Sequence, residues 1–126
     1  MDKVQLNLIV LYSQDIERSK TFYEALGLQF AKERHGQGKD HYACELGSTV
    51  LEIYPLSAEQ AAAPSTRLGF SVSSIDQVVV RLAKVNHRPV TEPRGSPWGR
   101  RAVLQDPDGH RVELIELREV ENEPAP

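Results

Sequence analysis

The sequence predicts an α+β fold made of two halves that repeat one order of elements, strand-helix-strand-strand-strand. Each half has alternating apolar patterns, typical of strands, around one amphipathic helical stretch. The helical patterns begin at Ile16 and Ile75, and the last strand of each half carries a glutamate, Glu52 or Glu113. We therefore expect one domain over residues 1–126. Its modules are expected at about 4–56 and 67–117, with a small, polar, proline-bearing linker at 57–66 and a frayed tail at 118–126.

The first half begins with an alternating segment at 4–12, which predicts a strand. Both of its faces are apolar from Leu8 onward, so we expect this strand to be buried on two sides. Ser13 or Asp15 can cap the following helix with a side-chain oxygen, and Gly27 is a natural end for it. The helix should bury one stripe, formed by Ile16, Phe22, Tyr23 and Leu26.

Three strands complete the first half. The strand after the helix is expected at 28–30, because the polar segment 31–40 with its two glycines is typical of a loop. Strand patterns at 41–46 and 49–56 flank Gly47 and Ser48, which suit a two-residue hairpin turn.

The second half repeats this plan. A strand is predicted at 67–73, followed by a capping box in which Ser74 is the N-cap and Gln77 the third helical residue. Asn86 can take the left-handed conformation that ends the helix, and Pro89 prevents its continuation. After a loop rich in proline and glycine, strands are predicted at 101–105 and 110–117 around a turn at 106–109.

Antiparallel counting predicts which residues lie beside each glutamate. A two-residue turn at 47–48 places Ala43 opposite Glu52 and His41 opposite Tyr54. Glu52 then shares a face with His41, Ala43, Val50 and Tyr54. A four-residue turn at 106–109 places Ala102 opposite Glu113 and Arg100 opposite Ile115. Each half thus sets a small alanine beside a glutamate, which leaves room in front of the carboxylate.

Glutamate is disfavoured in the middle of a strand, so both positions need an explanation. One interpretation is structural: each carboxylate lies on a sheet face, paired with arginine or exposed to water. The other is functional: both face one cavity. In that case the cavity is lined by Leu8, Phe70, Ala43 and Ala102, with Tyr54 and Trp98 near its rim.

Composition excludes several classes of protein. The net charge is −3, with 15 basic and 18 acidic residues, which argues against a nucleic-acid-binding surface. No apolar run approaches the roughly 20 residues of a membrane span, and the N-terminal residues do not resemble a signal peptide. One cysteine excludes an internal disulfide and a cysteine-based zinc site. We therefore expect a cytoplasmic protein.

The spacing of three stretches resembles the vicinal oxygen chelate superfamily, which includes glyoxalase I, bleomycin-resistance proteins and extradiol dioxygenases. The stretches are Asp15-Ile16-Glu17-Arg18-Ser19 through Phe22-Tyr23 to Leu26-Gly27-Leu28; Leu51-Glu52-Ile53; and Pro97-Trp98-Gly99-Arg100 through Asp106-Pro107-Asp108-Gly109 to Val112-Glu113-Leu114. The resemblance implies two modules whose sheets curl around a cleft, usually in a homodimer.

The resemblance also implies a divalent metal in the enzymes of the superfamily. The ligands in small bacterial glyoxalase I are His, Glu, His and Glu, and their positions fall on Leu8, Glu52, Phe70 and Glu113. Both imidazoles are missing, and two carboxylates alone form a weak site for Ni²⁺, Co²⁺ or Zn²⁺. We therefore expect no cofactor and no stoichiometric Ni²⁺ or Zn²⁺. The alternative is a divalent metal held by Glu52 and Glu113, with His41 as a source of one nitrogen.

For several other residues the sequence allows two interpretations. Trp98 either stacks on a ligand or seals the core, and Tyr54 either hydrogen-bonds a ligand or is a half-buried sheet residue. Arg100 and Arg111 either clamp an anionic group or pair with Glu113. Three histidines beside loops are expected to be solvated, and Cys44 should alternate away from Glu52. The histidines are His35, His87 and His110.

Two classes of function follow. The first is a binding protein that sequesters or senses a small aromatic or amphipathic molecule without the usual metal. The second is a lyase or isomerase of the superfamily, in which Glu52 or Glu113 is a metal ligand or a general base with a pKa raised by burial. The expected partners are a small-molecule ligand and a second copy of the chain, with no nucleic acid and no membrane.

Overall fold

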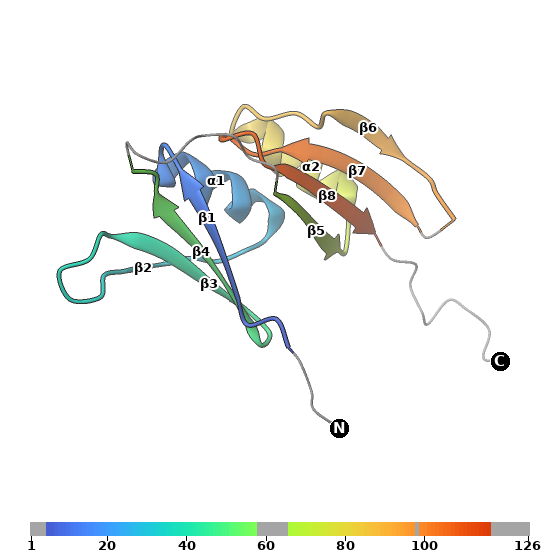
Figure 1. The fold of residues 1–126 in the computed structure, drawn as a ribbon. Coiled ribbons are helices and arrows are strands. Elements are labelled where there is room, and N and C mark those ends of the chain that lie inside the picture. The colour runs from blue at the N-terminus through green and yellow to red at the C-terminus, as the bar shows by residue number, and fades with distance from the viewer. Residues whose placement is uncertain (1–4, 58–65, 98, 117–126) are drawn as a thin grey trace, which may run out of the picture. The chain divides into compact units, whose positions relative to one another are not determined.

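Two mixed four-stranded sheets, each with one helix, make up the fold (Figure 1). The computed structural model describes residues 5–57, 66–97 and 99–116. The chain divides into two modules, module 1 up to residue 63 and module 2 from residue 64, and each contains one complete sheet. The predicted α+β fold with two βαβββ modules is confirmed.

Module 1 follows the order predicted from the sequence. Its strands lie in the order β1-β4-β3-β2; β1 pairs parallel with β4, and the other pairs are antiparallel. The elements are β1 (Leu8–Ser13), α1 (Ile16–Leu26), β2 (Ala31–Glu33), β3 (His41–Leu46) and β4 (Thr49–Pro55).

Module 2 repeats this topology. The strand order is β5-β8-β7-β6, with β5 and β8 parallel and the other pairs antiparallel. The elements are β5 (Arg67–Val72), α2 (Ile75–Lys84), β6 (Thr91–Arg94), β7 (Arg100–Gln105) and β8 (Arg111–Glu116). Within the described ranges, neither helix has the length and apolarity that crossing a bilayer requires.

The helix ends lie at the predicted residues. The carboxylate of Asp15 accepts hydrogen bonds from the backbone N–H groups of Glu17 and Arg18, and Gly27 ends α1 in the left-handed region at φ 115°. The Ser74 hydroxyl accepts from the N–H of Gln77, and Asn86 after α2 has φ 66°. These caps satisfy backbone groups that a helix end leaves open.

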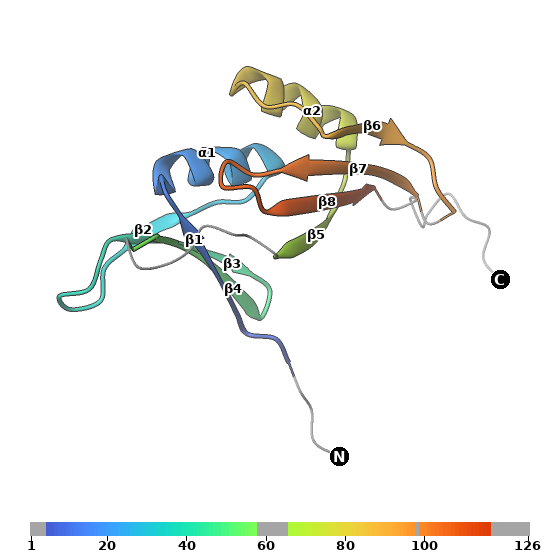
Figure 2. The ribbon, with the colours of Figure 1, turned by 45° about the horizontal axis from the view of Figure 1, so that its top comes forward.

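Each helix covers one face of its own sheet (Figures 1 and 2). The core of module 1 joins an aromatic and aliphatic stripe of α1 to the strand residues beneath it: Phe22, Tyr23, Leu26, Leu11, Tyr42, Cys44, Leu51 and Ile53. In module 2 the corresponding residues are Ile75, Val78, Leu82, Ala102, Leu104, Val112 and Leu114. Burial of this apolar surface stabilises each module, and it leaves the other face of each sheet outside the helix-packed core.

The predicted burial of the first strand on both sides is wrong. Strand β1 begins at Leu8 rather than at residue 4. Leu11 is buried, whereas Leu8 and Tyr12 keep 48% and 44% of their surface exposed. The reason is that α1 covers only one face of the sheet.

The strand after α1 also lies later than predicted. No strand forms at 28–30; β2 occupies Ala31–Glu33 and pairs with β3. The ring of Phe30 lies 6.5 Å from that of Tyr23 on α1, so this residue contributes to packing around the helix. The polar composition of 31–33 suits an edge strand, which needs only one neighbour.

The register of the second hairpin is one residue away from the predicted one. Val103, not Ala102, lies opposite Glu113, and Ala102 lies opposite Leu114. Arg100 lies opposite Glu116 rather than Ile115. A shift by one residue moves a side chain to the other face, so Ala102 is buried beneath α2 instead of lying beside Glu113.

The extra residue belongs to the turn. The N–H of Asp106 donates to the carbonyl of His110 at 2.9 Å, and Gly109 has φ 95°. The Asp106 carboxylate accepts from the His110 backbone N–H at 2.8 Å and lies 2.7 Å from His110 Nδ1. His110 is therefore buried in the turn, and the expectation that it is solvated is wrong.

Candidate functional site

The face of the module 1 sheet opposite α1 carries the first part of the site. Ala31 pairs with Ala43, Ala43 with Glu52, and Glu52 with Val10, so these four residues form one row across the four strands. The predicted placement of Ala43 beside Glu52 is confirmed. The side chains of Ala31 and Ala43 are single methyl groups, so they leave space above the sheet beside the Glu52 carboxylate.

A cavity of about 760 Å³ lies over this row. Its floor includes Ala31, Ala43 and Val50, and three glutamates line it. The other lining residues are Gly27, Leu28, Gln29, Phe30, Cys44 and Leu46, and the glutamates are Glu33, Glu45 and Glu52. Cys44 belongs to the helix-covered core by its burial, as predicted from its alternation. The cavity combines an apolar floor with carboxylates and has no lysine or arginine among its described lining residues.

The neighbouring row contains a ring stack. Glu33 pairs with His41, and Tyr12 pairs with Tyr54. The imidazole of His41 stacks on the ring of Tyr54 with centroids 4.1 Å apart and 9° between the planes. The predicted neighbourhood of His41, Tyr54 and Glu52 on one face is therefore confirmed.

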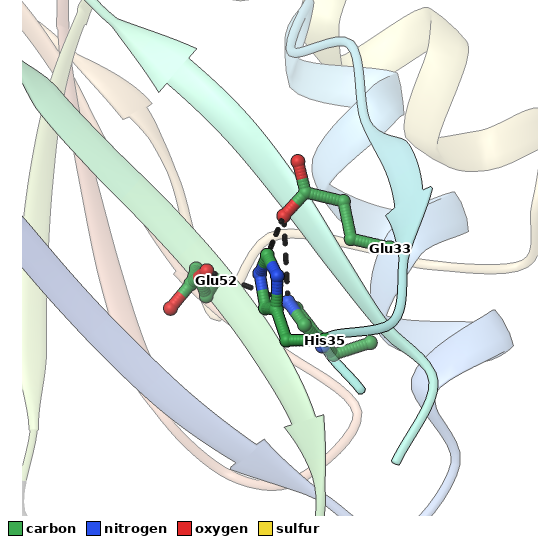
Figure 3. A group of neighbouring side chains, drawn as sticks. Glu33, His35 and Glu52 are labelled. Atoms are coloured by element: carbon green, nitrogen blue, oxygen red, sulfur yellow. Dashed lines mark ion pairs between the residues drawn. The ribbon is translucent and has the colours of Figure 1, made fainter. Parts of the chain in front are cut away.

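His41 lies between two carboxylates. Its Nε2 is 3.5 Å from an oxygen of Glu33 and 3.5 Å from an oxygen of Glu52. His35 Nε2 lies 3.5 Å from the same Glu33 oxygen. Figure 3 shows Glu33, His35 and Glu52 converging from three segments of module 1, with dashed lines marking the ion pairs.

Sequence reasoning missed Glu33 and His35 as members of this group. Both lie in the segment 31–40, whose composition is typical of a loop. Glu33 comes next to His41 because Ala31–Glu33 forms β2. The sequence signal for this group is that one glutamate and two histidines, at positions 33, 35 and 41, lie within a single stretch of nine residues around the expected loop.

Glu113 in module 2 has different surroundings. Arg67 donates to one of its oxygens, Arg101 Nη2 lies 2.6 Å from the other, and Arg111 Nε lies 3.5 Å away. The hydrogen bond from Arg67 is the main cause that lowers the pKa of Glu113 below its usual value, against the opposing effect of burial. Of the two glutamates for which a raised pKa was considered, Glu113 therefore has a lowered one. A carboxylate paired in this way is a poor general base and a poor metal ligand.

The other arginine considered from the sequence has another partner. Arg100 Nη1 lies 2.6 Å from a carboxylate oxygen of Asp76, at the start of α2. Arg111 does pair with Glu113, in agreement with one of its two readings. Trp98 lies outside the described residues.

The four positions that hold the metal in glyoxalase I do not fit a metal here. Leu8 lies on the same face as Glu52, as its pairing with Val50 shows, but it offers no donor atom. Phe70 pairs with Leu114 and so lies on the face opposite Glu113, and it too lacks a donor. The ionised carboxylate of Glu113 is already paired with arginine side chains. Of the two glutamates among the four, Glu52 lines the cavity of about 760 Å³, whereas Glu113 lines a smaller one of about 210 Å³ that Arg101 also lines.

Comparison with known proteins agrees with the fold. Residues 5–114 match the model of the Glyoxalase/Bleomycin resistance protein/Dioxygenase superfamily, and the chain belongs to this superfamily. It is 32% identical over 112 residues to the anthracycline biosynthesis protein DauV of Streptomyces sp. (strain C5). That match covers 88% of this chain but 41% of DauV, so the chain spans well under half of this relative.

Two similar solved structures differ in their described roles. The antibiotic binding protein TnmS3 from Streptomyces sp. CB03234 has a TM-score of 0.71 and 24% identity, covering 91% of this chain and 97% of TnmS3. Oxidase ChaP-H2 also has a TM-score of 0.71 and 24% identity, covering 90% and 94% of the two chains. The same fold is thus used for binding and for catalysis, and function must be argued from the site.

Proposed function

We propose that this chain binds a small aromatic or amphipathic molecule in the module 1 cavity, and that it sequesters or senses this molecule without the superfamily's usual metal. The cavity is the observation that carries the proposal. Its volume of about 760 Å³ lies within the usual range of roughly 300–1,000 Å³ for small-molecule sites. Leu28, Phe30 and the alanine floor provide the apolar surface that a flat ring system needs.

The charge of the cavity specifies the ligand further. Glu33, Glu45 and Glu52 contribute carboxylates. An apolar ligand without polar groups would leave these carboxylates desolvated, which is costly. We therefore expect a ligand with an aromatic body and an amine or several hydroxyl donors. The antibiotic-binding role of TnmS3 and the anthracycline role of DauV support this class of ligand.

The test is a binding titration with a variant that fills the cavity. Ala43→Leu adds a branched side chain to the cavity floor, and we expect it to weaken binding of an anthracycline by at least about tenfold, as 1.4 kcal/mol of lost contact would. The probe's own fluorescence reports the binding. The control is Ala83→Leu, which adds the same side chain at an exposed position of α2. Binding should be unchanged in this control.

Two results would contradict the proposal. One is equal affinity of the wild-type chain and Ala43→Leu at equal thermal stability, which would place the ligand elsewhere. The other is no binding of anthracyclines or of other amine-bearing aromatic compounds by the wild-type chain.

An enzymatic function is the second candidate, and the position of Glu52 favours it. Glu52 faces the cavity at 15% exposure, whereas Glu113 is paired with arginines. A lyase or isomerase would use Glu52 as the base for a carbon acid next to a carbonyl group. Glu52→Gln separates the two candidates, because an enzyme would lose turnover and keep ligand affinity, whereas a binding protein has no turnover to lose.

A further inference from the structure

We propose that Glu33, His35, His41 and Glu52 form a binding site for one divalent transition-metal ion of the Zn²⁺ type, contained entirely within module 1. Each residue offers one ligand atom, and the four atoms all lie within 4.8 Å of one another. The site shares only Glu52 with the four positions that the resemblance to glyoxalase I singled out. It goes beyond the proposed ligand binding, and it is tested with the metal alone, so either proposal can fail without the other.

The distances within the group suit a metal better than hydrogen bonds. Three contacts are 3.5 Å long: His41 to Glu33, His41 to Glu52, and His35 to Glu33. Such contacts are too long for charge-assisted hydrogen bonds, which measure about 2.7–2.9 Å. Zinc binds nitrogen and oxygen at about 2.0–2.2 Å, and two neighbouring ligands of a tetrahedral ion are then about 3.4 Å apart. The observed separations are close to this value.

His41 Nε2 is the second, independent observation. Only 1% of the His41 side chain is exposed, and Nε2 is buried with no hydrogen-bond partner among the described residues. Buried polar atoms without a partner are rare and costly, so we expect this nitrogen to bind a group that the described residues do not supply. It points toward Glu33 and Glu52, whose oxygens are also acceptors when ionised. A cation placed among the three groups resolves the conflict.

The second nitrogen of His41 has the surroundings expected of a metal ligand. Nδ1 lies 3.2 Å from the carbonyl oxygen of Lys39 and donates to it in the tautomer that carries the proton on Nδ1. That tautomer leaves the lone pair on Nε2, which is the form a metal needs. The stacked ring of Tyr54 holds the imidazole in its orientation.

The loop 34–40 places the second imidazole. His35 lies with its ring centroid 5.2 Å from that of His41. Its carbonyl accepts from the N–H of Gly38 at 2.9 Å, and an ion pair of 2.9 Å joins Arg34 to Asp40. Both contacts join residues of this loop and so hold its conformation between β2 and β3. The side chain of His35 is 72% exposed, so an ion can enter from the solvent side.

The donor set selects the class of metal. Two imidazoles and two carboxylates suit Zn²⁺, Co²⁺ or a similar first-row ion, whereas Mg²⁺ and Ca²⁺ prefer oxygen ligands alone. The expectation of a metal-free chain followed from Leu8 and Phe70, and it took no account of Glu33 and His35. Glu33 and Glu52 also line the cavity, so the ion would lie at its edge.

The experiment uses the chelator-treated chain at pH 7.5 with Zn²⁺ in equilibrium dialysis and with Co²⁺ in visible absorption. We expect one ion per chain and intense visible bands for Co²⁺, as tetrahedral coordination gives. Long-range ¹H–¹⁵N spectra of the wild-type chain should show Zn²⁺ shifting the ring nitrogens of His35 and His41 but not those of His87 and His110. This readout needs no substitution and includes its own control histidines.

Variants then locate the ion. Glu52→Gln should weaken Zn²⁺ binding more than about tenfold. Glu45→Gln, on the same sheet and in the same cavity but outside the group, should leave it unchanged. His35→Ala changes an exposed residue and so preserves the fold while removing one ligand; it should also weaken binding. The proposal is overturned if the wild-type chain takes up no ion, or if Zn²⁺ leaves the His35 and His41 nitrogens unshifted. Equal affinity in Glu52→Gln and His35→Ala would also overturn it.

Discussion

Three guanidinium groups surround the carboxylate of Glu113, so its ionised form is favoured in the folded chain. The hydrogen bond from Arg67 is the largest cause that lowers its pKa. A lowered pKa gives stability that is present above the ordinary value of 4.5 and is lost as the pH falls through the pKa of the folded state. The arginines thus favour the ionised carboxylate, and their pairing with it contributes to the stability of module 2.

The first prediction concerns this group of charges. Glu113→Gln should lower the free energy of unfolding at pH 7 by about 1 kcal/mol, a modest value because the arginines are largely exposed and screened by solvent. The variant should also lose part of the acid-dependent fall in stability below pH 4.5. Urea denaturation between pH 3 and pH 7 measures both effects. Glu92→Gln, an exposed carboxylate on β6, is the control, and a pH profile shared by all three chains would refute the prediction.

At the same scale, the residues of module 1 show what alternation can predict. His41, Ala43, Glu52 and Tyr54 were placed on one face because side chains alternate along a strand and a two-residue turn fixes the pairing. Glu33 and His35 were not placed, because the pairing of a short polar edge strand depends on tertiary contacts that its own composition does not reveal. Of the four proposed metal ligands, His41 and Glu52 were therefore predictable as neighbours from the sequence, and Glu33 and His35 were not.

At the scale of elements, the two hairpins differ in how their turns are held. Gly47 has φ 61°, which only a residue such as glycine adopts easily, and the turn has the predicted two residues. In the second hairpin the Asp106 carboxylate accepts two backbone N–H groups, from Asp108 and His110, and so enlarges the turn by one residue. Asp-Pro-Asp-Gly indicates a turn but not its length, and one residue of length decides which face Ala102 occupies.

The loop before β7 provides a prediction at this scale. Gly99 has φ 132°, and a methyl group on its Cα would overlap the carbonyl oxygen of Glu116 on β8. Gly99→Ala should therefore lower the free energy of unfolding by about 1–3 kcal/mol, because the backbone must change or β7 must move away from β8. Thermal unfolding measures the effect.

The matched control is Gly95→Ala in the same loop, where an added methyl group meets nothing within 4 Å. This variant should change stability by less than about 0.5 kcal/mol. Equal stability of the two variants would show that the approach of Gly99 to Glu116 is not required in solution.

At the scale of the whole molecule, β1 carries apolar side chains that α1 does not cover. Leu8 and Tyr12 lie on one face of this strand and are 48% and 44% exposed, and Leu6 before them is 63% exposed. Adjacent exposed apolar side chains favour association. Members of a family built from paired modules also have a simple route to assembly, because a symmetric contact uses the same surface twice.

We therefore predict a homodimer at micromolar concentration. Sedimentation equilibrium should give twice the 14.1 kDa mass of the chain. Leu8→Asp should shift the equilibrium toward single chains, whereas Val80→Asp, which places the same charge at an exposed apolar position of α2, should not. A mass of 14.1 kDa for the wild-type chain would rule the dimer out.

Each sheet is built from strands of one half of the chain, and this has a consequence for the origin of the gene. Within residues 5–57, 66–97 and 99–116, every strand pair joins two strands of the same module. A gene that encoded one half could be copied end to end without breaking a single pair of strands. After such a copying event, the two halves would be free to diverge. Module 2 could then acquire arginines around Glu113, and module 1 could acquire histidines near Glu52.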